Sequence, residues 1–547
     1  MNINIRKNIF STVIAGTLFL ILTVNLEPMY FRVTCAYASD PWKGRAVVAT
    51  AYGTVEGIED IHNTWVWKAI PYARPPVGDL RWKAPQNPEP WSETRQEADF
   101  CNQCPQFVFN QNGSTPVIEG NEDCLYLNIW RPQTTETGLP VYFWIHGGSN
   151  VQGSANPYCG AAIASRANMV VVTINYRLGP FGWFTHPALR DGEDEIDRSG
   201  NYATLDMIKA LEWVRDNIGA FGGNPQNVTI AGQSAGGINV LSLMISPRAG
   251  NLFHRVISQS GGLNVASQKD GDSYANTVIE ALLLQDGISE KSTRSVREKM
   301  NNDEIKTYLR SKTMTEFFTA IYGMRNNPAV FGDGAVIRTE GADAFDDAEK
   351  YHQVPVIIGS TSEEGKLFMY LNGAYQFLGN RIYQWIGKRG SQIGRRYGLD
   401  TLVKKMSAHE SQPPVYSYIF QYGQYRKNGY NAWPTDSGPT DTMNWAIALG
   451  ACHALDIPFN FGLIGVFPLF GSINDIIFRE DNQLGQELLS HAMIDYTAQF
   501  ARTGNPNLEG LPEWTPWPHK MLPRSPRFLL FDANDNEAII YMAYDVR

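Results

Sequence analysis

One segment near the middle of the chain constrains the fold more than any other. Residues 228–231 (VTIA) form a short apolar run typical of a buried strand, and Ala235 to Ile245 has the pattern of a helix. Gly232-Gln233-Ser234-Ala235-Gly236 lies at their junction, so a serine occupies a sharp strand-to-helix turn. Such a turn lifts a hydroxyl clear of the backbone, and the flanking glycines remove side chains that would clash there. The pattern therefore predicts a nucleophilic Ser234, with a plain strand–turn–helix connection as the alternative.

Apolar runs alternate with helical patterns around this segment. The helix expected at Asp206 to Phe221 has apolar residues at helical spacing and ends before two glycines. Strands that alternate with helices predict an α/β fold, in which a large, mostly parallel central sheet has helices on both faces. Residues 265–330 and 375–410 have helical patterns, and we expect them to form cap insertions. The further strands that we expect are Val141 to Ile145, Met169 to Asn175, Val256 to Ser258 and Val354 to Ile358.

A second glycine-rich turn follows the strand expected at Val141 to Ile145. It reads His146-Gly147-Gly148, and glycine lets a substrate approach backbone N–H groups closely. Together with the N–H of Ala235, those of Gly147 and Gly148 are the expected donors to a negatively charged oxygen that develops during acyl transfer. We expect His146 to brace this turn rather than act as a base, because the base follows the nucleophile in chains of this type.

Several long motifs resemble those of one known family. Trp67 to Trp82 (WKAIPYARPPVGDLRW) and Glu122 to Asn128 (EDCLYLN) are similar to the two signatures of the type-B carboxylesterases, which include the cholinesterases and bile-salt lipases. Shorter motifs follow in the order of that family. They are Asn175 to Gly179, Gly200 to Tyr202, Phe221 to Pro225 and Phe500 to Pro506. The resemblance implies the α/β-hydrolase fold, a single catalytic domain over residues 42–547 and hydrolysis of carboxylic esters.

The same resemblance implies the partners of Ser234. The family's acid is a glutamate directly before a glycine and just after a strand, which matches Glu364, with the adjacent Glu363 as the alternative. The family's base is a histidine before an apolar–Phe–Gly stretch, which matches His453. Ser260 and Asp456 match the positions of a support pair that orients and stabilises the histidine.

Six cysteines occur in the chain. The resemblance implies a disulfide between Cys104 and Cys124, with Cys101 competing for the same partner. The roles of Cys101, Cys159 and Cys452 stay open, and a reactive thiol at Cys452 is the alternative to a packing role.

Charge and composition exclude some classes of function. The formal net charge is -9, whereas binding to nucleic acid needs a basic surface. We expect a small-molecule ester as the substrate, with no metal, no organic cofactor and no obligate protein partner. Cholinesterases carry glutamate where this chain has Gln233, and a tryptophan that residues 112–121 lack, so choline esters are poor candidates. The alternative function is a catalytically silent adhesion module of the neuroligin type, which is disfavoured because all three catalytic positions are filled.

The first residues indicate export. Arg6 and Lys7 precede an uncharged run from Asn8 to Leu26, and Ala36-Tyr37-Ala38 offers a cleavage site. Residues 1–38 are therefore expected to be a signal peptide or a signal anchor. Both alternatives place the body of the protein outside the cytosol, as a secreted or periplasmic enzyme or as one anchored by this segment.

Overall fold

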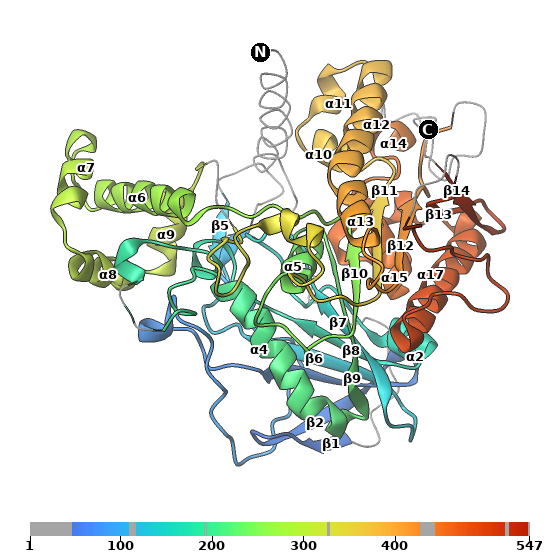
Figure 1. The fold of residues 1–547 in the computed structure, drawn as a ribbon, viewed down its shortest axis with the longest axis horizontal. Coiled ribbons are helices and arrows are strands. Elements are labelled where there is room, and N and C mark those ends of the chain that lie inside the picture. Colours follow the sequence, from blue (N-terminus) through green and yellow to red (C-terminus); the bar gives the residue numbers. More distant parts are fainter. Residues whose placement is uncertain are drawn as a thin grey trace.

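A large sheet forms the centre of the molecule (Figure 1). The computed structural model describes residues 46–108, 116–190, 192, 194–324, 329–426, 444–519 and 525–544. Within these ranges the sheet has 12 strands. In spatial order they are β1 (Ala46–Ala49), β2 (Thr54–Asp60), β3 (Thr64–Pro71), β6 (Tyr126–Pro132), β8 (Val170–Ile174), β7 (Leu139–Ile145), β9 (Gly223–Gln233), β10 (Arg255–Gln259), β11 (Val356–Thr361), β12 (Val415–Phe420), β13 (Phe528–Ala533) and β14 (Ala538–Ala543).

The strands from β8 to β13 pair in parallel. The sheet becomes antiparallel at its two edges, through β1, β2, β3 and β6 on one side and β14 on the other. Every residue of β8 (VVVTI) is buried, as expected for a β-branched run in a sheet that is covered on both faces. The predicted α/β fold with a mostly parallel sheet is therefore confirmed.

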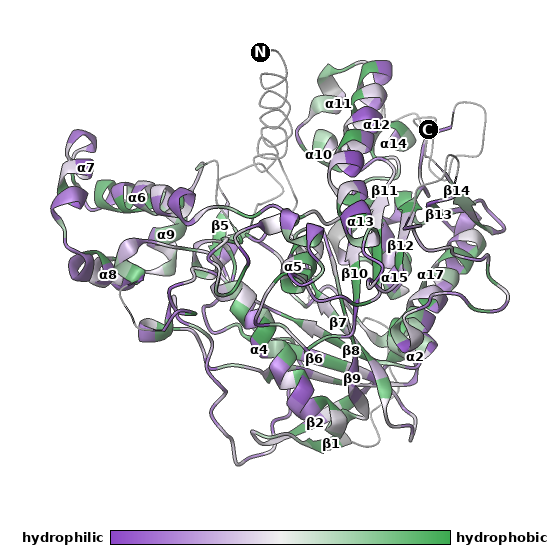
Figure 2. Cartoon of the chain, viewed as in Figure 1, coloured by the Kyte–Doolittle hydropathy of each residue, from purple (hydrophilic) through white to green (hydrophobic). Residues whose placement is uncertain are grey.

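Helices cover both faces of the sheet. The side chains of β7 alternate between two cores, because successive residues of a strand point to opposite faces. Val141 and Phe143 belong to one core, and Tyr142 and Trp144 to the other. In Figure 2 many residues of the central strands have the colour of hydrophobic residues. The first core includes residues of α4 (Tyr202–Asn217) and α5 (Ala235–Met244), and the second includes residues of α2 (Ala161–Ala167), α15 (Asp456–Phe461) and α17 (Gln483–Thr503).

Two helical insertions follow strands of the sheet, as the sequence predicts for residues 265–330 and 375–410. The first follows β10 and the second follows β11 (Figure 1). The first has a small core of its own, in which α6, α8 and α9 pack with Trp82. The first comprises α6 (Gln268–Gln285), α7 (Glu290–Lys299), α8 (Asn302–Ser311) and α9 (Met314–Ile321), and the second α10 (Gly365–Leu371), α11 (Ala374–Phe377), α12 (Asn380–Tyr397) and α13 (Leu399–Ser407).

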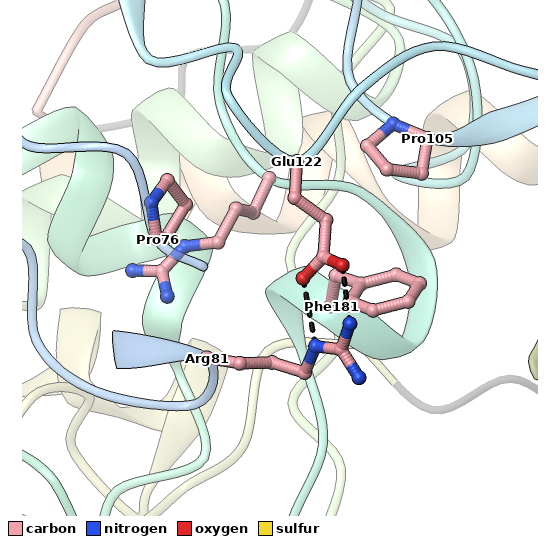
Figure 3. A pocket seen from close by; sticks show the side chains of 6 residues that line it. Pro76, Arg81, Pro105, Glu122 and Phe181 are labelled. Carbon is pink, nitrogen blue, oxygen red and sulfur yellow. Dashed lines mark hydrogen bonds and ion pairs between the residues drawn. The ribbon is translucent and has the colours of Figure 1, made fainter. Parts of the chain in front are cut away.

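Charged residues of the two long sequence motifs form an internal ion pair. Figure 3 shows Arg81 and Glu122 facing each other beside Phe181, in a small pocket. The Arg81 Nε donates to Glu122 Oε2 at 2.7 Å, and a second nitrogen of Arg81 donates to the Lys312 carbonyl at 2.6 Å. This guanidinium therefore joins both motifs to the first helical insertion, so the pocket in Figure 3 is part of the scaffold.

The structure also pairs Cys104 with Cys124, the disulfide that the resemblance implies. Cys101 and Cys452 have free thiols, and both Cys159 and Cys452 are buried. The expected signal segment, residues 1–38, lies outside the described residues. No helix among those described is both long and apolar enough to span a bilayer.

Candidate active site

Ser234 occupies the turn between β9 and α5. Its φ of 57° and ψ of -122° lie in a region that residues other than glycine rarely adopt, which is typical of strained positions at functional sites. The turn is fixed because the Ser234 N–H donates to the Gln259 carbonyl of β10 at 2.8 Å. A side chain on Gly232 would lie 2.5 Å from the carbonyl carbon of Gly236, so the two glycines are required by the close approach of strand and helix.

The glycine turn after β7 packs against the turn that carries Ser234. A Cβ on Gly147 would lie 2.7 Å from the Gln233 carbonyl oxygen and 3.1 Å from the Ser234 Cβ. Gly148 has a φ of 108°, which favours glycine. Ala235 is the first residue of α5. The three predicted oxyanion donors thus belong to two segments that meet at Ser234.

His146 lies within this glycine turn and is buried. Its Nδ1 is 2.7 Å from the Gly147 carbonyl, and its ring stacks on Tyr176 with 4.3 Å between the ring centroids. The Tyr176 hydroxyl donates to the His146 carbonyl at 2.7 Å. Burial lowers the pKa of His146 to about 4, so the ring is neutral at pH 7. These contacts support the bracing role expected for His146.

Glu364 lies just before α10 and is hydrogen bonded to His453. The contact joins Glu364 Oε2 to His453 Nδ1. The other carboxylate oxygen accepts from the Ser260 hydroxyl at 2.5 Å and from the Thr361 N–H at 2.7 Å. Burial alone raises the pKa of Glu364, but attraction to His453 and the hydrogen bonds from His453, Ser260 and Thr361 outweigh it and lower the pKa below its ordinary value. The carboxylate is therefore ionised and can hold the imidazole in one orientation.

The second nitrogen of His453 faces the Ser234 turn. His453 Nε2 lies 3.1 Å from the side-chain nitrogen of Gln233, the residue before Ser234. Because Nδ1 donates to Glu364, Nε2 is the accepting nitrogen and the Gln233 amide is its donor. The imidazole thus bridges the carboxylate of Glu364 and the strand end that positions Ser234.

Glu363, the alternative acid, has a different partner. Its carboxylate lies 2.7 Å from Lys366 Nζ and accepts the Ala451 N–H at 3.1 Å. Both charged side chains are almost completely buried. This pair joins the loop of Glu364 to the loop before His453. No sequence motif marks Lys366, and a lysine in a helical pattern normally points to solvent.

The two expected support residues occupy different places. Ser260 bonds directly to Glu364, whereas Asp456 accepts the Tyr418 hydroxyl at 2.5 Å. That hydroxyl in turn accepts the side-chain amide of Gln259 at 3.2 Å. Gln259 directly precedes Ser260. This buried chain of hydrogen bonds therefore links Asp456 to the backbone segment whose Ser260 bonds to Glu364. Tyr418 was also missed, because no motif marks a tyrosine within β12.

The buried Asp456 predicts a pH dependence of stability. Burial raises its pKa from 3.8 to about 6, although the hydrogen bond from Tyr418 opposes the rise. A carboxyl whose pKa is higher in the folded state contributes stability below its unfolded pKa, and this is lost as the pH rises through 6. Asp456→Asn should therefore gain stability relative to the wild type between pH 4 and pH 8, by about 3 kcal/mol.

Urea unfolding of both proteins across this pH range measures the effect. The exposed Asp535 gives a matched control, because Asp535→Asn should leave the pH profile of the wild type unchanged. A difference between the wild type and Asp456→Asn that stays constant with pH would contradict the prediction.

Comparisons with known proteins agree with this architecture. A model of the carboxylesterase family matches residues 44–389 and 391–540. A para-nitrobenzyl esterase of Bacillus subtilis is 30% identical over 491 residues, which cover 85% of this chain and 91% of that protein. A fumonisin B1 esterase of Sphingopyxis macrogoltabida is 37% identical over 336 residues, which cover 61% of this chain and 58% of that protein.

A solved structure has the same fold. The carboxylesterase of Geobacillus stearothermophilus superimposes with a TM-score of 0.68 and 28% identity, covering 91% of this chain and 98% of that one. The family model spans nearly the whole sequence, and the resemblance of the sequence motifs is therefore confirmed. This chain belongs to the carboxylesterase family and is an enzyme of that family.

Proposed function

We propose that this carboxylesterase hydrolyses its ester substrates through a covalent acyl-enzyme, with Ser234 as the nucleophile, His453 as the base and Glu364 as the acid of the triad. The supporting observation is the position of the imidazole. One nitrogen is bonded to Glu364 and the other faces the turn of Ser234, 3.1 Å from the Gln233 amide. Hydrogen bonds around a base are often rearranged when substrate binds. In the reaction the Ser234 hydroxyl therefore replaces the Gln233 amide at His453 Nε2.

The proposed chemistry has two steps. The Ser234 oxygen attacks the ester carbonyl while His453 takes its proton, and the resulting imidazolium is stabilised by Glu364. His453 then returns the proton to the alcohol, which leaves as the bond between acyl carbon and alcohol oxygen breaks. In the second step, water gives a proton to His453 and attacks the acyl carbon. The acid is released, and the serine recovers its proton.

The backbone supplies the charge stabilisation in this proposal. The N–H groups of Gly147, Gly148 and Ala235 donate to the tetrahedral oxyanion, and the positive end of the α5 dipole lies at the same place. One such donor is worth about 2.7 to 4 kcal/mol in the transition state. The contact between Gly147 and the Ser234 turn fixes these donors before substrate arrives.

A fluorophosphonate probe tests the nucleophile. We expect the wild type to be labelled and Ser234→Ala to lose labelling completely, because the probe reacts only with an activated serine. Ser242 lies on the same helix and its hydroxyl is bonded to the Ile238 carbonyl, so Ser242→Ala should label like the wild type. A folded wild-type protein that does not label would contradict Ser234 as an activated nucleophile.

We further infer that the protein is exported. The N-terminal charge and apolar pattern supports this, and so does the disulfide between Cys104 and Cys124, because such bonds persist in oxidising compartments.

A further inference from the structure

Helix α12 exposes a stripe of apolar side chains on its outward face. Ile382, Trp385 and Ile386 have the spacing i, i+3, i+4, which places them on one side of a helix. Trp385 is 64% exposed, and Phe377, which precedes the helix, is 83% exposed. The opposite face is the buried one and consists of Tyr383, Gly387, Ser391 and Arg395. A surface helix normally has the reverse arrangement, with its apolar side turned to the core.

The inner face of α12 is hydrogen bonded to the loops of the proposed active site. The Tyr383 hydroxyl donates to the carbonyls of Lys366 at 3.1 Å and Ala448 at 2.7 Å. The Ser391 hydroxyl accepts the N–H of Gly365, the residue after Glu364, at 3.1 Å. These contacts hold α12 in place, so the outward stripe is fixed at the surface. Figure 1 shows α11 and α12 projecting beyond the sheet.

The charged side chains of α12 itself all have one sign. No aspartate or glutamate occurs between Gly365 and Leu399, although the whole chain has a net charge of -9. Figure 2 shows hydrophobic and hydrophilic residues side by side on α12. Outside its buried face, the basic residues of this helix are Arg381, Lys388, Arg389 and Arg396. A tryptophan and aliphatic side chains beside arginine and lysine, with no acidic residue, complement a surface that is apolar within and anionic at its boundary.

We propose that the outward face of α12 docks this protein on an anionic phospholipid membrane. Amphipathic helices of this composition lie in the plane of the headgroups, with the apolar side chains inserted and the basic ones near the anionic groups. The inner face of the same helix contacts the residues that flank Glu364. Docking would therefore bring the catalytic loops close to esters dissolved in that membrane, a consequence that rests on the proposed function.

Sedimentation with vesicles tests the docking surface. The full-length protein is mixed with phosphatidylcholine vesicles that contain or lack phosphatidylglycerol. We expect preferential binding to the anionic vesicles, weakened by salt. The variant Ile382→Ser/Trp385→Ser/Ile386→Ser should bind the anionic vesicles more weakly by a factor of about ten or more, because its apolar anchors are lost. A matched control is Leu284→Ser/Tyr322→Ser/Leu484→Ser, which removes three apolar side chains of similar exposure elsewhere and should bind like the wild type.

The remaining outcomes decide against the proposal. Residues 1–45 are present in every variant, so equal binding by the α12 variant and the wild type shows that another part of the chain binds the vesicles. Binding without preference for phosphatidylglycerol overturns the anionic partner. Concentration-dependent dimers in light scattering that the α12 variant abolishes, without vesicle binding, show that the stripe is an interface between copies. Ser234→Ala should bind vesicles like the wild type, which separates this test from that of the proposed function.

Discussion

Ser234→Ala and His453→Ala are each expected to lower kcat for an activated ester such as nitrophenyl acetate by about a million-fold. Neither variant removes a group that binds the ground state, so KM should change little. Glu364→Gln should cost less, about ten thousand-fold, because the imidazole and the nucleophile remain and only orientation and charge stabilisation are lost. Steady-state kinetics on the purified variants measure all three effects.

The double variant gives the sharper test of a shared step. If Ser234 and His453 act on one proton transfer, Ser234→Ala/His453→Ala should be no slower than either single variant. Ser242→Ala is the control and should keep the kcat of the wild type. Independent, multiplying effects of the two substitutions would contradict a common mechanism, as would a Ser234→Ala variant within tenfold of the wild type.

The sequence could predict those strands whose own residue pattern is distinctive, without knowledge of their neighbours. The β8 run is apolar throughout because both of its faces are covered, and this can be read directly. The edge strands carry no such signal. In β2 (TVEGIED), acidic residues and a glycine interrupt the apolar positions, and its antiparallel pairing with β3 depends on contacts between strands. The antiparallel edges were therefore not predicted.

The candidate site divides in the same way. Ser234, Glu364 and His453 lie in motifs, because each position needs particular neighbours along the chain, such as the glycines beside the serine. Tyr418 and Lys366 have no such neighbours. Their roles arise because β12 and α10 come close to the His453 loop in space, and a single sequence does not contain that proximity. The contact between Gln233 and His453 is of the same kind, since it joins residues far apart in sequence.

Lys366→Met is expected to destabilise the fold by about 3 to 5 kcal/mol, the second large effect. Lys366 Nζ lies 2.7 Å from Glu363, and both side chains are withdrawn from water. Without the ammonium group, the Glu363 carboxylate would stay buried without this counter-charge. It would keep the hydrogen bond from the Ala451 N–H. Urea unfolding measures the loss. The exposed pair of Lys350 and Glu340 is the control, and Lys350→Met should cost less than about 1 kcal/mol.

The double variant Glu363→Gln/Lys366→Met separates the charge from the packing. The neutral amide that replaces the Glu363 carboxylate leaves no buried charge and keeps an oxygen that can accept the Ala451 N–H, so most of the lost stability should return. The Glu363 side chain joins the Glu364 loop to the loop before His453, and an amide oxygen at this position can keep that contact. The double variant should therefore also recover the kcat that Lys366→Met loses. A double variant as unstable as Lys366→Met would show that Lys366 acts by filling space. A stable double variant that stays slow would show instead that the charged pair itself positions His453.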